Sequence, residues 1–214
     1  MQKNIKNTTA KEQMLKKIRQ ALLQKRENPY PNFEETALHV RETEPMDILF
    51  AERFTAVAGK FVYCEDEVSF IENLLSLAEK EKLRKMYAWE SPVQQLLDRY
   101  EFPFFRTEKD FMEAEAGITT CEALIARSGS VLVSNGNAGG RRLNIYPHIH
   151  IVVAYTAQLV MDIKDGLALM QQKYGAALPS LISVVTGPSR TADIEKTLVL
   201  GAHGPKELYV FLLD

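Results

Sequence analysis

Cysteine is scarce in this chain, which has only Cys64 and Cys121 among its 214 residues. The two lie far apart in the sequence and form no Cys-x-x-Cys pair. A disulfide framework, a structural zinc site and an iron–sulfur cluster each need more cysteines or a closer spacing. We therefore expect no metal, cluster or other cofactor on this chain, and a reducing, cytoplasmic setting is the simplest inference.

An excess of positive charge and long apolar runs are also missing. The 26 basic and 28 acidic residues give a net charge of −2, which creates no general field to attract nucleic acid or an anionic membrane. The apolar runs are shorter than the roughly 20 residues that span a bilayer, and no signal-peptide core follows Met1. Neither nucleic acid nor a membrane is therefore an expected partner.

The chain does contain a balanced share of apolar residues, 46%, which is typical of a globular protein. From Thr9 to about Lys25 apolar residues recur at helical spacing, with basic residues between them, which predicts an amphipathic helix. Prolines 29 and 31 end this helix, and no periodicity follows as far as residue 45. We therefore divide the chain into a helical N-terminal extension and linker, residues 1–45, and an α/β domain, residues 46–214.

Strands and helices alternate in the first part of that domain. The pattern predicts a helix over 47–58, a strand over 61–64, a helix capped by Asp66, a strand over 86–89 and a helix opened by Ser91-Pro92. Such alternation is typical of a parallel layered sheet.

The pattern changes after residue 105. Strands at 123–126 and 131–133 flank a Ser-Gly turn, as in a hairpin. A strand at 149–154, a helix from Thr156 to Gly175 and strands at 181–185 and 208–213 follow. Together these elements predict a three-layer α/β domain with a mixed sheet and helices on both faces, preceded by the added helical N-terminus.

The richest stretch of polar residues, which we name the Gly-Pro motif, covers residues 186–195. After the apolar strand at 181–185, Gly187-Pro188 turns the chain, and Ser189 or Thr191 can cap a helix whose first turn carries Asp193 and Glu195. A helix that begins at the carboxyl end of a strand presents backbone N–H groups to an anion. An ordinary strand-to-helix turn explains the same residues, but the concentration of Ser, Arg, Thr, Asp, Glu and His over 15 residues favours a site.

A second candidate is the glycine loop, residues 135–140, which leads directly into Arg141 and Arg142. Glycines allow the backbone to approach an anion, and arginine offers two parallel donors to a carboxylate or phosphate. A hairpin loop with two solvated arginines is the simpler alternative. We predict that the loop and the motif converge at the carboxyl edge of the sheet. The predicted ligand-binding residues are Asn135, Gly136, Arg141, Arg142, Gly187, Pro188, Ser189, Arg190, Thr191, Asp193, Glu195, His203 and Gly204.

His148 and His150 are candidates for metal ligands. His148 and His150 alternate along a predicted strand and would share one face of it. Asp193 and Glu195 lie two apart on the predicted helix and do not face the same way, so they do not complete a ligand set. We predict no metal site, and the sequence identifies no nucleophile–base pair, so no catalytic residue is assigned.

These segments carry a family resemblance. GPSRTADIE, followed by LVLGAHGPKELYVFLLD, resembles the C-terminal signature of the LUD-domain family of the lactate-utilization protein C type. The resemblance extends upstream through residues 117–119, 126–130, 141–142 and 147–151. It implies a fold similar to the NagB/ribose-5-phosphate isomerase/CoA-transferase group. It also implies a role beside iron–sulfur partner proteins in the oxidation of lactate to pyruvate.

At one position the chain departs from the family pattern. Arg127 stands in the turn Arg127-Ser-Gly-Ser130, where the family often has glutamate, so acyl or CoA transfer through a carboxylate there is not expected. The leading hypothesis is an accessory subunit that binds a small anion and works with iron–sulfur partners. The alternative is a stand-alone enzyme or sensor for a phosphorylated or carboxylated metabolite.

Overall fold

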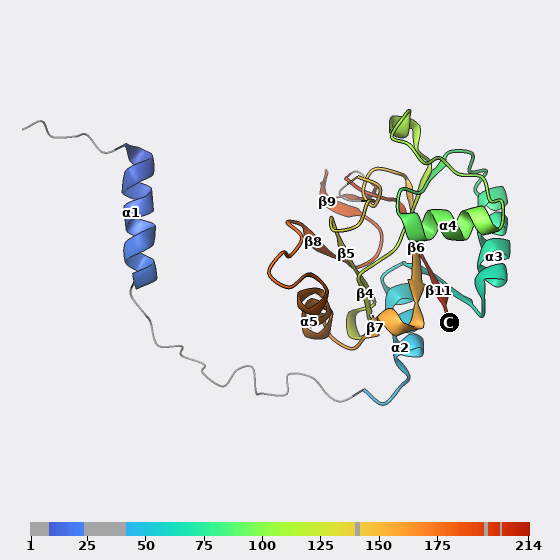
Figure 1. Ribbon diagram of the computed structural model, residues 1–214, viewed down its shortest axis with the longest axis horizontal. Coiled ribbons are helices and arrows are strands. Elements are labelled where there is room, and N and C mark those ends of the chain that lie inside the picture. Colours follow the sequence, from blue (N-terminus) through green and yellow to red (C-terminus); the bar gives the residue numbers. More distant parts are fainter. Residues whose placement is uncertain (1–8, 24–41, 140–141, 195–196, 202) are drawn as a thin grey trace, which may run out of the picture. The chain divides into compact units, whose positions relative to one another are not determined.

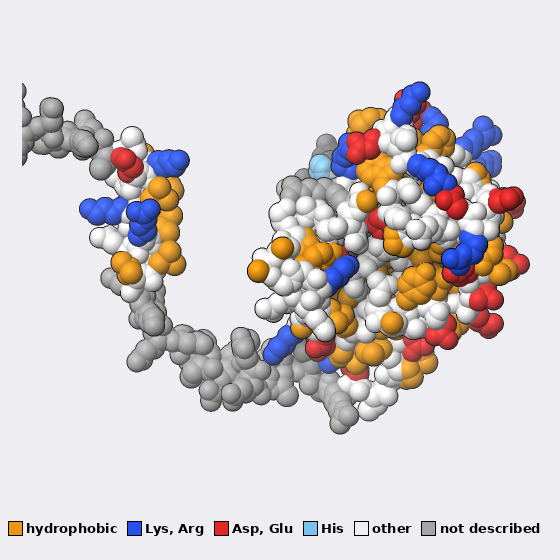
Figure 2. Space-filling model, viewed as in Figure 1, with side chains coloured by type: hydrophobic (Ala, Val, Ile, Leu, Met, Phe, Trp, Pro, Cys, Tyr) orange, Lys and Arg blue, Asp and Glu red, His pale blue; other side chains and the backbone are white. Residues whose placement is uncertain are grey.

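The computed structural model in Figure 1 describes residues 9–23, 42–139, 142–194, 197–201 and 203–214. It contains two compact units, Met1–Thr43 and Glu44–Asp214. The first unit holds α1 (Ala10–Leu23), which begins with reciprocal hydrogen bonds between Thr9 and Glu12. No residue of α1 is buried, and its apolar side chains gather along one side while Lys and Arg occupy another (Figure 2).

The second unit is built on a five-stranded parallel sheet. Its order is β1 (Lys60–Cys64), β11 (Glu207–Leu213), β6 (Ile149–Tyr155), β3 (Ala116–Thr119) and β2 (Met86–Tyr87). Strands β6 and β11 are apolar at nearly every position because both faces of this sheet are covered. The alternation of side chains along β6 and β11 then supplies two separate cores.

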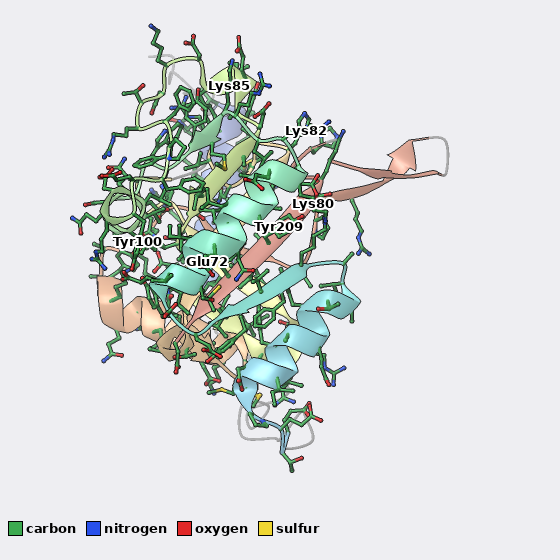
Figure 3. The ribbon with its side chains drawn as sticks, turned by 90° about the vertical axis from the view of Figure 1, so that its right-hand side faces the viewer. Glu72, Lys80, Lys82, Lys85, Tyr100 and Tyr209 are labelled. Atoms are coloured by element: carbon green, nitrogen blue, oxygen red, sulfur yellow. The ribbon has the colours of Figure 1, made fainter. Side chains whose placement is uncertain are left out.

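One core lies between the sheet and two helices, α3 (Glu67–Lys80) and α4 (Ser91–Arg99). Phe70 of α3 packs edge-on against Phe211 of β11, with ring centroids 5.4 Å apart. Figure 3 shows α3 lying across this face of the sheet, near Tyr209 of β11. Asp66 caps α3 as predicted, because its side chain accepts a hydrogen bond from the Ser69 N–H.

The other face of the parallel sheet packs against α2 (Met46–Ala56) and a second sheet. That sheet has the order β7 (Leu159–Val160), β4 (Ala123–Ile125), β5 (Ser130–Ser134) and β8 (Ile182–Val185). Strands β4, β5 and β8 pair antiparallel, whereas β7 is parallel to β4. The outer face of the second sheet is covered by α5 (Ile163–Tyr174), so the layers run from α3 and α4 through two sheets to α5 (Figure 1).

The α/β class and the parallel alternation of the first half are confirmed, but the single mixed sheet is wrong. The predicted hairpin forms β4 and β5, joined through the 3-10 helix η3 (Ala126–Ser128). Leu124 points into the core shared with the parallel sheet, while Ile125 and Leu132 point into the core under α5. A hairpin that is apolar on both faces must be covered on both, so it forms a separate layer.

The helix predicted from Thr156 begins later. A 3-10 helix, η4 (Thr156–Gln158), comes first, and Leu159 and Val160 then pair with β4 as strand β7. The α-helix begins after Asp162, whose side chain and that of Asp165 cap each other's backbone N–H groups. Pairing with β4 therefore takes precedence over the helical spacing of the apolar residues.

The helix predicted within the Gly-Pro motif is also wrong. Residues Arg190–Ile194 form strand β9, which pairs antiparallel with β10 (Thr197–Leu200). This hairpin extends away from the two larger sheets (Figure 3). Thr, Asp and Ile are poor helix formers, and β10, which contains β-branched residues, begins three residues after β9. Pairing between these two segments is therefore favoured over the helix that the capping residues predict. Glu195 lies outside the described residues.

The remaining element of the domain is a 3-10 helix, η2 (Phe111–Glu113), in the loop before β3. Among the described residues, none of the helices is both long enough and apolar enough to cross a membrane.

Candidate functional site

The Gly-Pro motif lies at the amino edge of the parallel sheet. The N–H of Ser189 donates to the carbonyl of Pro205, just before β11, at 2.9 Å. The guanidinium of Arg190 donates to the carbonyl of Val57, just before β1, at 2.7 Å. Because β1 and β11 are parallel, both contacts lie where strands begin. The predicted position at the carboxyl edge is therefore wrong.

Close packing shapes the motif. Gly187 has a φ of 83°, and a Cβ atom there would lie 2.3 Å from the carbonyl oxygen of Val57. Gly187 and Pro188 are buried, and Gly204 lies against the side chain of Ser189, whereas His203 is exposed. Thr191 and Asp193 lie on β9. Of the predicted residues, the structure thus brings Ser189 and Gly204 together.

The second predicted half, around Arg142, lies beside β2. Its guanidinium forms an ion pair with Glu108 and sits over the rings of Trp89 and Phe111, 5.4 and 5.6 Å from their centroids. Trp89 follows β2, the strand at the far edge from β1. The motif contacts the starts of β1 and β11 instead, so the two predicted halves are not brought together. Arg141 lies outside the described residues.

The donors of Asn135 and Gly136, at the start of the glycine loop, are used within the protein. Asn135 bonds to the N–H of Leu181 and to the hydroxyl of Ser180, which fixes the end of β5 to the start of β8. The N–H of Gly136 donates to the Ser134 hydroxyl at 3.0 Å. The loop is therefore fastened to the second sheet at its start.

The two histidines of the β6 region occupy different surroundings. His148 precedes β6 and is exposed, whereas His150 is 1% exposed and its Nε2 lies 2.8 Å from the Thr119 hydroxyl. Burial lowers the pKa of His150 to about 3, so this imidazole is neutral. Within the part of the chain that the structure describes, no group of three or more His, Cys, Asp or Glu side chains is placed to hold a metal ion.

A buried carboxylate that the sequence analysis missed lies at the carboxyl edge of the parallel sheet. Glu90 follows β2 and is 5% exposed, and its Oε2 accepts hydrogen bonds from the N–H and the hydroxyl of Thr120, just after β3. The N–H of Gly139 donates to the same carboxylate. Burial raises the pKa of Glu90, although these hydrogen bonds oppose the shift.

Glu90 borders a small polar cavity of about 10 Å³, which we name the Glu90 cavity. Its walls come from the ends of β2, β3 and β5 and from the glycine loop, and they comprise Glu90, Thr119, Thr120, Val133, Ser134, Asn137, Gly139 and Asn144. The Oδ1 of Asn144 is buried and has no hydrogen-bond partner, and Asn137 donates to the Thr120 hydroxyl at 3.2 Å. The volume suits one water-sized occupant.

A second buried carboxylate, Glu122, adjoins this cavity through Ser134. The Ser134 hydroxyl donates to Glu122 at 2.6 Å, and Tyr174 and Lys173 of α5 donate to it at 2.8 Å each. Burial alone would raise the pKa of Glu122, but the hydrogen bonds from Lys173, Ser134 and Tyr174 hold it below its usual value. Glu122 is therefore an ionised anchor for α5, whereas Glu90 has a raised pKa.

A signal for this site was present in the sequence. Glu90 and Thr120 each come directly after a short apolar strand, and the carboxyl ends of parallel strands meet at one edge of a sheet, where α/β folds place their ligands. From the sequence alone, we expected this arrangement only after the strand at 181–185, which belongs to the second sheet. Ser91 was predicted to cap α4, but Glu90 occupies the cap position.

The unusual Arg127 has a structural role. Its Nε lies 2.8 Å from Asp162 at the start of α5, and the arginine side chain is only 19% exposed. This ion pair joins the turn of the β4–β5 hairpin to α5. The residue that departs from the expected family pattern therefore fastens the β4–β5 hairpin to α5.

Comparison with known proteins gives one family. Residues 49–213 match the sequence profile described as the LUD domain. The chain is 35% identical over 113 residues to lactate utilization protein C of Geobacillus sp. (strain WCH70), which covers 51% of this chain and 47% of that protein. The protein of the same name from Bacillus subtilis (strain 168) is 34% identical over 105 residues, with 48% and 44% covered. The chain spans about half the length of the curated relatives it matches.

A solved structure has a similar fold. The crystal structure of a DUF162 family protein from Deinococcus radiodurans matches with a TM-score of 0.57 and 17% identity, over 79% of this chain and 96% of that one. At this level of identity the likeness concerns the fold alone.

Proposed function

Since this chain belongs to the LUD domain family, we propose that it acts in lactate utilization as an accessory subunit beside iron–sulfur proteins that accept the electrons when lactate is oxidised to pyruvate. The observation that carries the proposal is the similarity to relatives named lactate utilization protein C. A fold of the NagB/ribose-5-phosphate isomerase/CoA-transferase group, in a cytoplasmic setting, is part of the same proposal.

The position of the two cysteines supports the proposal that the iron–sulfur clusters are carried by partner proteins. Cys64 belongs to the core beneath α3, and Cys121 belongs to the core between the two sheets, so they lie on opposite faces of the parallel sheet. Burial raises the pKa of both thiols, which disfavours the thiolate that binds iron. Lactate oxidation releases two electrons, and a separate carrier is needed to receive them.

We place the proposed small anion at Arg142. Both members of its ion pair with Glu108 are at least half exposed, and exposed pairs contribute only about 0–1 kcal/mol. A ligand carboxylate can therefore replace Glu108, while Trp89 and Phe111 hold the guanidinium in position. Two donors of the Gly-Pro motif, the Ser189 N–H and the Arg190 guanidinium, already bond to main-chain carbonyls, which makes that edge a poorer choice.

Reconstitution tests the accessory role. Purified chain is mixed with D- or L-lactate and an artificial electron acceptor, alone and then together with purified iron–sulfur lactate-utilization proteins. We expect no turnover from the chain alone, and turnover with the partners that falls when the chain is left out. Equal turnover of the partners with and without the chain would refute the proposal.

One observation favours the alternative of a stand-alone enzyme or sensor for a carboxylated or phosphorylated metabolite. Glu90 and Glu122 are two buried carboxylates in different surroundings, at the edge of the sheet where α/β folds place their chemistry. Robust lactate turnover by the chain alone, lost in Glu90→Gln, would establish that alternative in place of the accessory role.

A further inference from the structure

The Glu90 cavity is rich in oxygen atoms whose hydrogen-bonding capacity is not used. The Asn144 Oδ1 is buried without a partner. The Ser134 hydroxyl gives its proton to Glu122 and accepts one bond from Gly136, which leaves a lone pair free. The Thr120 hydroxyl gives its proton to Glu90, and Asn137 gives an amide proton to Thr120. The walls therefore offer several oxygen acceptors beside the amide groups of Asn137 and Asn144.

The cavity also borders the buried Glu90 carboxyl group, whose hydrogen bonds from Thr120 and Gly139 favour its ionised form. Among residues 42–139, 142–194, 197–201 and 203–214, no basic side chain forms an ion pair with Glu90. A single water would supply two protons but no charge, so it would leave the carboxylate uncompensated. A buried charge is stable in a protein only when it is paired or coordinated.

We propose that the Glu90 cavity binds one dehydrated monovalent metal cation, Na⁺ or K⁺, through the Glu90 carboxylate, the Asn144 Oδ1 and the Ser134 Oγ. One carboxylate balances one positive charge, and the other ligands are neutral oxygens. Mg²⁺ keeps several waters and needs near-octahedral geometry, for which about 10 Å³ leaves no room.

Such a cation has a consequence for the neighbouring arginine. It would join the end of β2, through Glu90, to the end of β5, through Ser134, and to the loop that carries Asn144. Arg142 lies two residues before Asn144, so an occupied cavity holds the Arg142 loop in place. That fixing the Arg142 loop matters for anion binding rests on the proposed function. The existence of the cation site does not rest on it.

Thermal unfolding of the full chain in three chloride salts tests the site. NaCl, KCl and choline chloride are compared at one ionic strength, so that only specific binding differs. At about tenfold the dissociation constant we expect Na⁺ or K⁺ to raise the Tm by roughly 3–6 °C over choline. Equal Tm values in all three salts would overturn the proposal and leave a water in the cavity. A larger rise with MgCl₂ than with NaCl or KCl would overturn it too.

Variants separate the site from general salt effects. Glu90→Gln removes the charge and brings its own amide donor, and Asn144→Ala removes one ligand but keeps the charge; both should lose the cation-specific Tm rise. Glu108→Gln removes an exposed carboxylate outside the cavity and should keep it. Broadening of the ²³Na resonance by wild-type protein, absent with either cavity variant, gives a direct measure. A response of both cavity variants equal to that of the wild type contradicts the proposal, whatever the reconstitution assay shows.

Discussion

The two edges of the parallel sheet use their polar groups in different ways. At the amino edge, Ser189 and Arg190 bond to carbonyl oxygens in front of β11 and β1. At the carboxyl edge, Glu90 is buried against Thr120 and Gly139, beside an Asn144 oxygen that has no partner. Satisfied main-chain contacts stabilise a turn, whereas a buried charge and an unused acceptor need an occupant to compensate them. The proposals above accordingly make the first edge structural and place the ligands at the second.

The largest effect that tests this contrast is expected from Gly187→Ala. Its φ of 83° and the 2.3 Å approach of a Cβ atom to the Val57 carbonyl combine strain with a clash. We expect a loss of about 3 kcal/mol in the free energy of unfolding, measured by urea denaturation. Gly175→Ala is the matched control, because its φ is 57° but no atom lies within 4 Å of the added Cβ. Its ψ of −126° also strains an alanine, so this control should lose about 1–2 kcal/mol, less than Gly187→Ala.

The next effect concerns ligand binding at Arg142. Arg142→Ala should weaken the binding of lactate or pyruvate, measured by calorimetry, by about 10- to 100-fold, since a charged hydrogen bond contributes roughly 1.5–3 kcal/mol. Arg190→Ala removes an arginine from the amino edge and should leave binding unchanged. If Arg190→Ala weakens binding and Arg142→Ala does not, the assignment of the two edges must be reversed.

The protonation of His150 is expected to make stability depend on pH. The expected change in free energy is similar to or smaller than that for Arg142→Ala. The native state holds this imidazole neutral, with a pKa near 3, whereas the unfolded chain titrates near 6.5. As the pH falls below 6.5 the unfolded state binds the proton first, so the contribution of His150 to stability decreases steadily down to about pH 3. We expect about 2 kcal/mol less stability from this group at pH 5 than at pH 7, lost in His150→Gln. Equal pH profiles for the two proteins would mean that His150 is protonated without unfolding.

The smallest effect is expected from Glu108→Gln. Breaking an exposed ion pair should change the free energy of unfolding by less than about 1 kcal/mol. Because the variant frees Arg142, the same change should tighten anion binding a few-fold. Weaker binding in this variant would show that Glu108 positions Arg142 and does not compete with the ligand.

Much of the fold follows from local pattern, because its helices and strands are set by short-range spacing. Asp66 at the start of α3 and the apolar runs of β6 and β11 are predicted from their immediate neighbours. The division of the strands between two sheets is not predicted in this way. Whether a strand joins the edge of one sheet or forms a second sheet over its face depends on contacts with distant segments. Asp162 and Asp165, which cap α5, were a readable signal, but the apolar spacing from Leu159 concealed it.

The candidate site was harder to predict than the fold. The Gly-Pro motif attracted attention through its density of polar residues, yet the Ser189 N–H and the Arg190 guanidinium bond to main-chain carbonyls. Glu90 stood in an ordinary strand-to-helix turn, and its burial depends on Gly139, nearly 50 residues away. Burial and unpaired acceptors are three-dimensional properties, so a single sequence gives only their possible location at the ends of parallel strands.

The pairing of β1 with β11 also determines when the sheet can form. Lys60 of β1 bonds to Tyr209 of β11 across 149 residues of chain, and β11 separates β1 from β6. A ribosome that adds about 5–20 residues per second needs roughly 7–30 s between these two segments. For that time β1 has no neighbour in the sheet, and one side of β6 is unpaired from its own synthesis until that of β11. The parallel sheet is therefore assembled from its β6 and β3 side, and the insertion of β11 is the step that closes it.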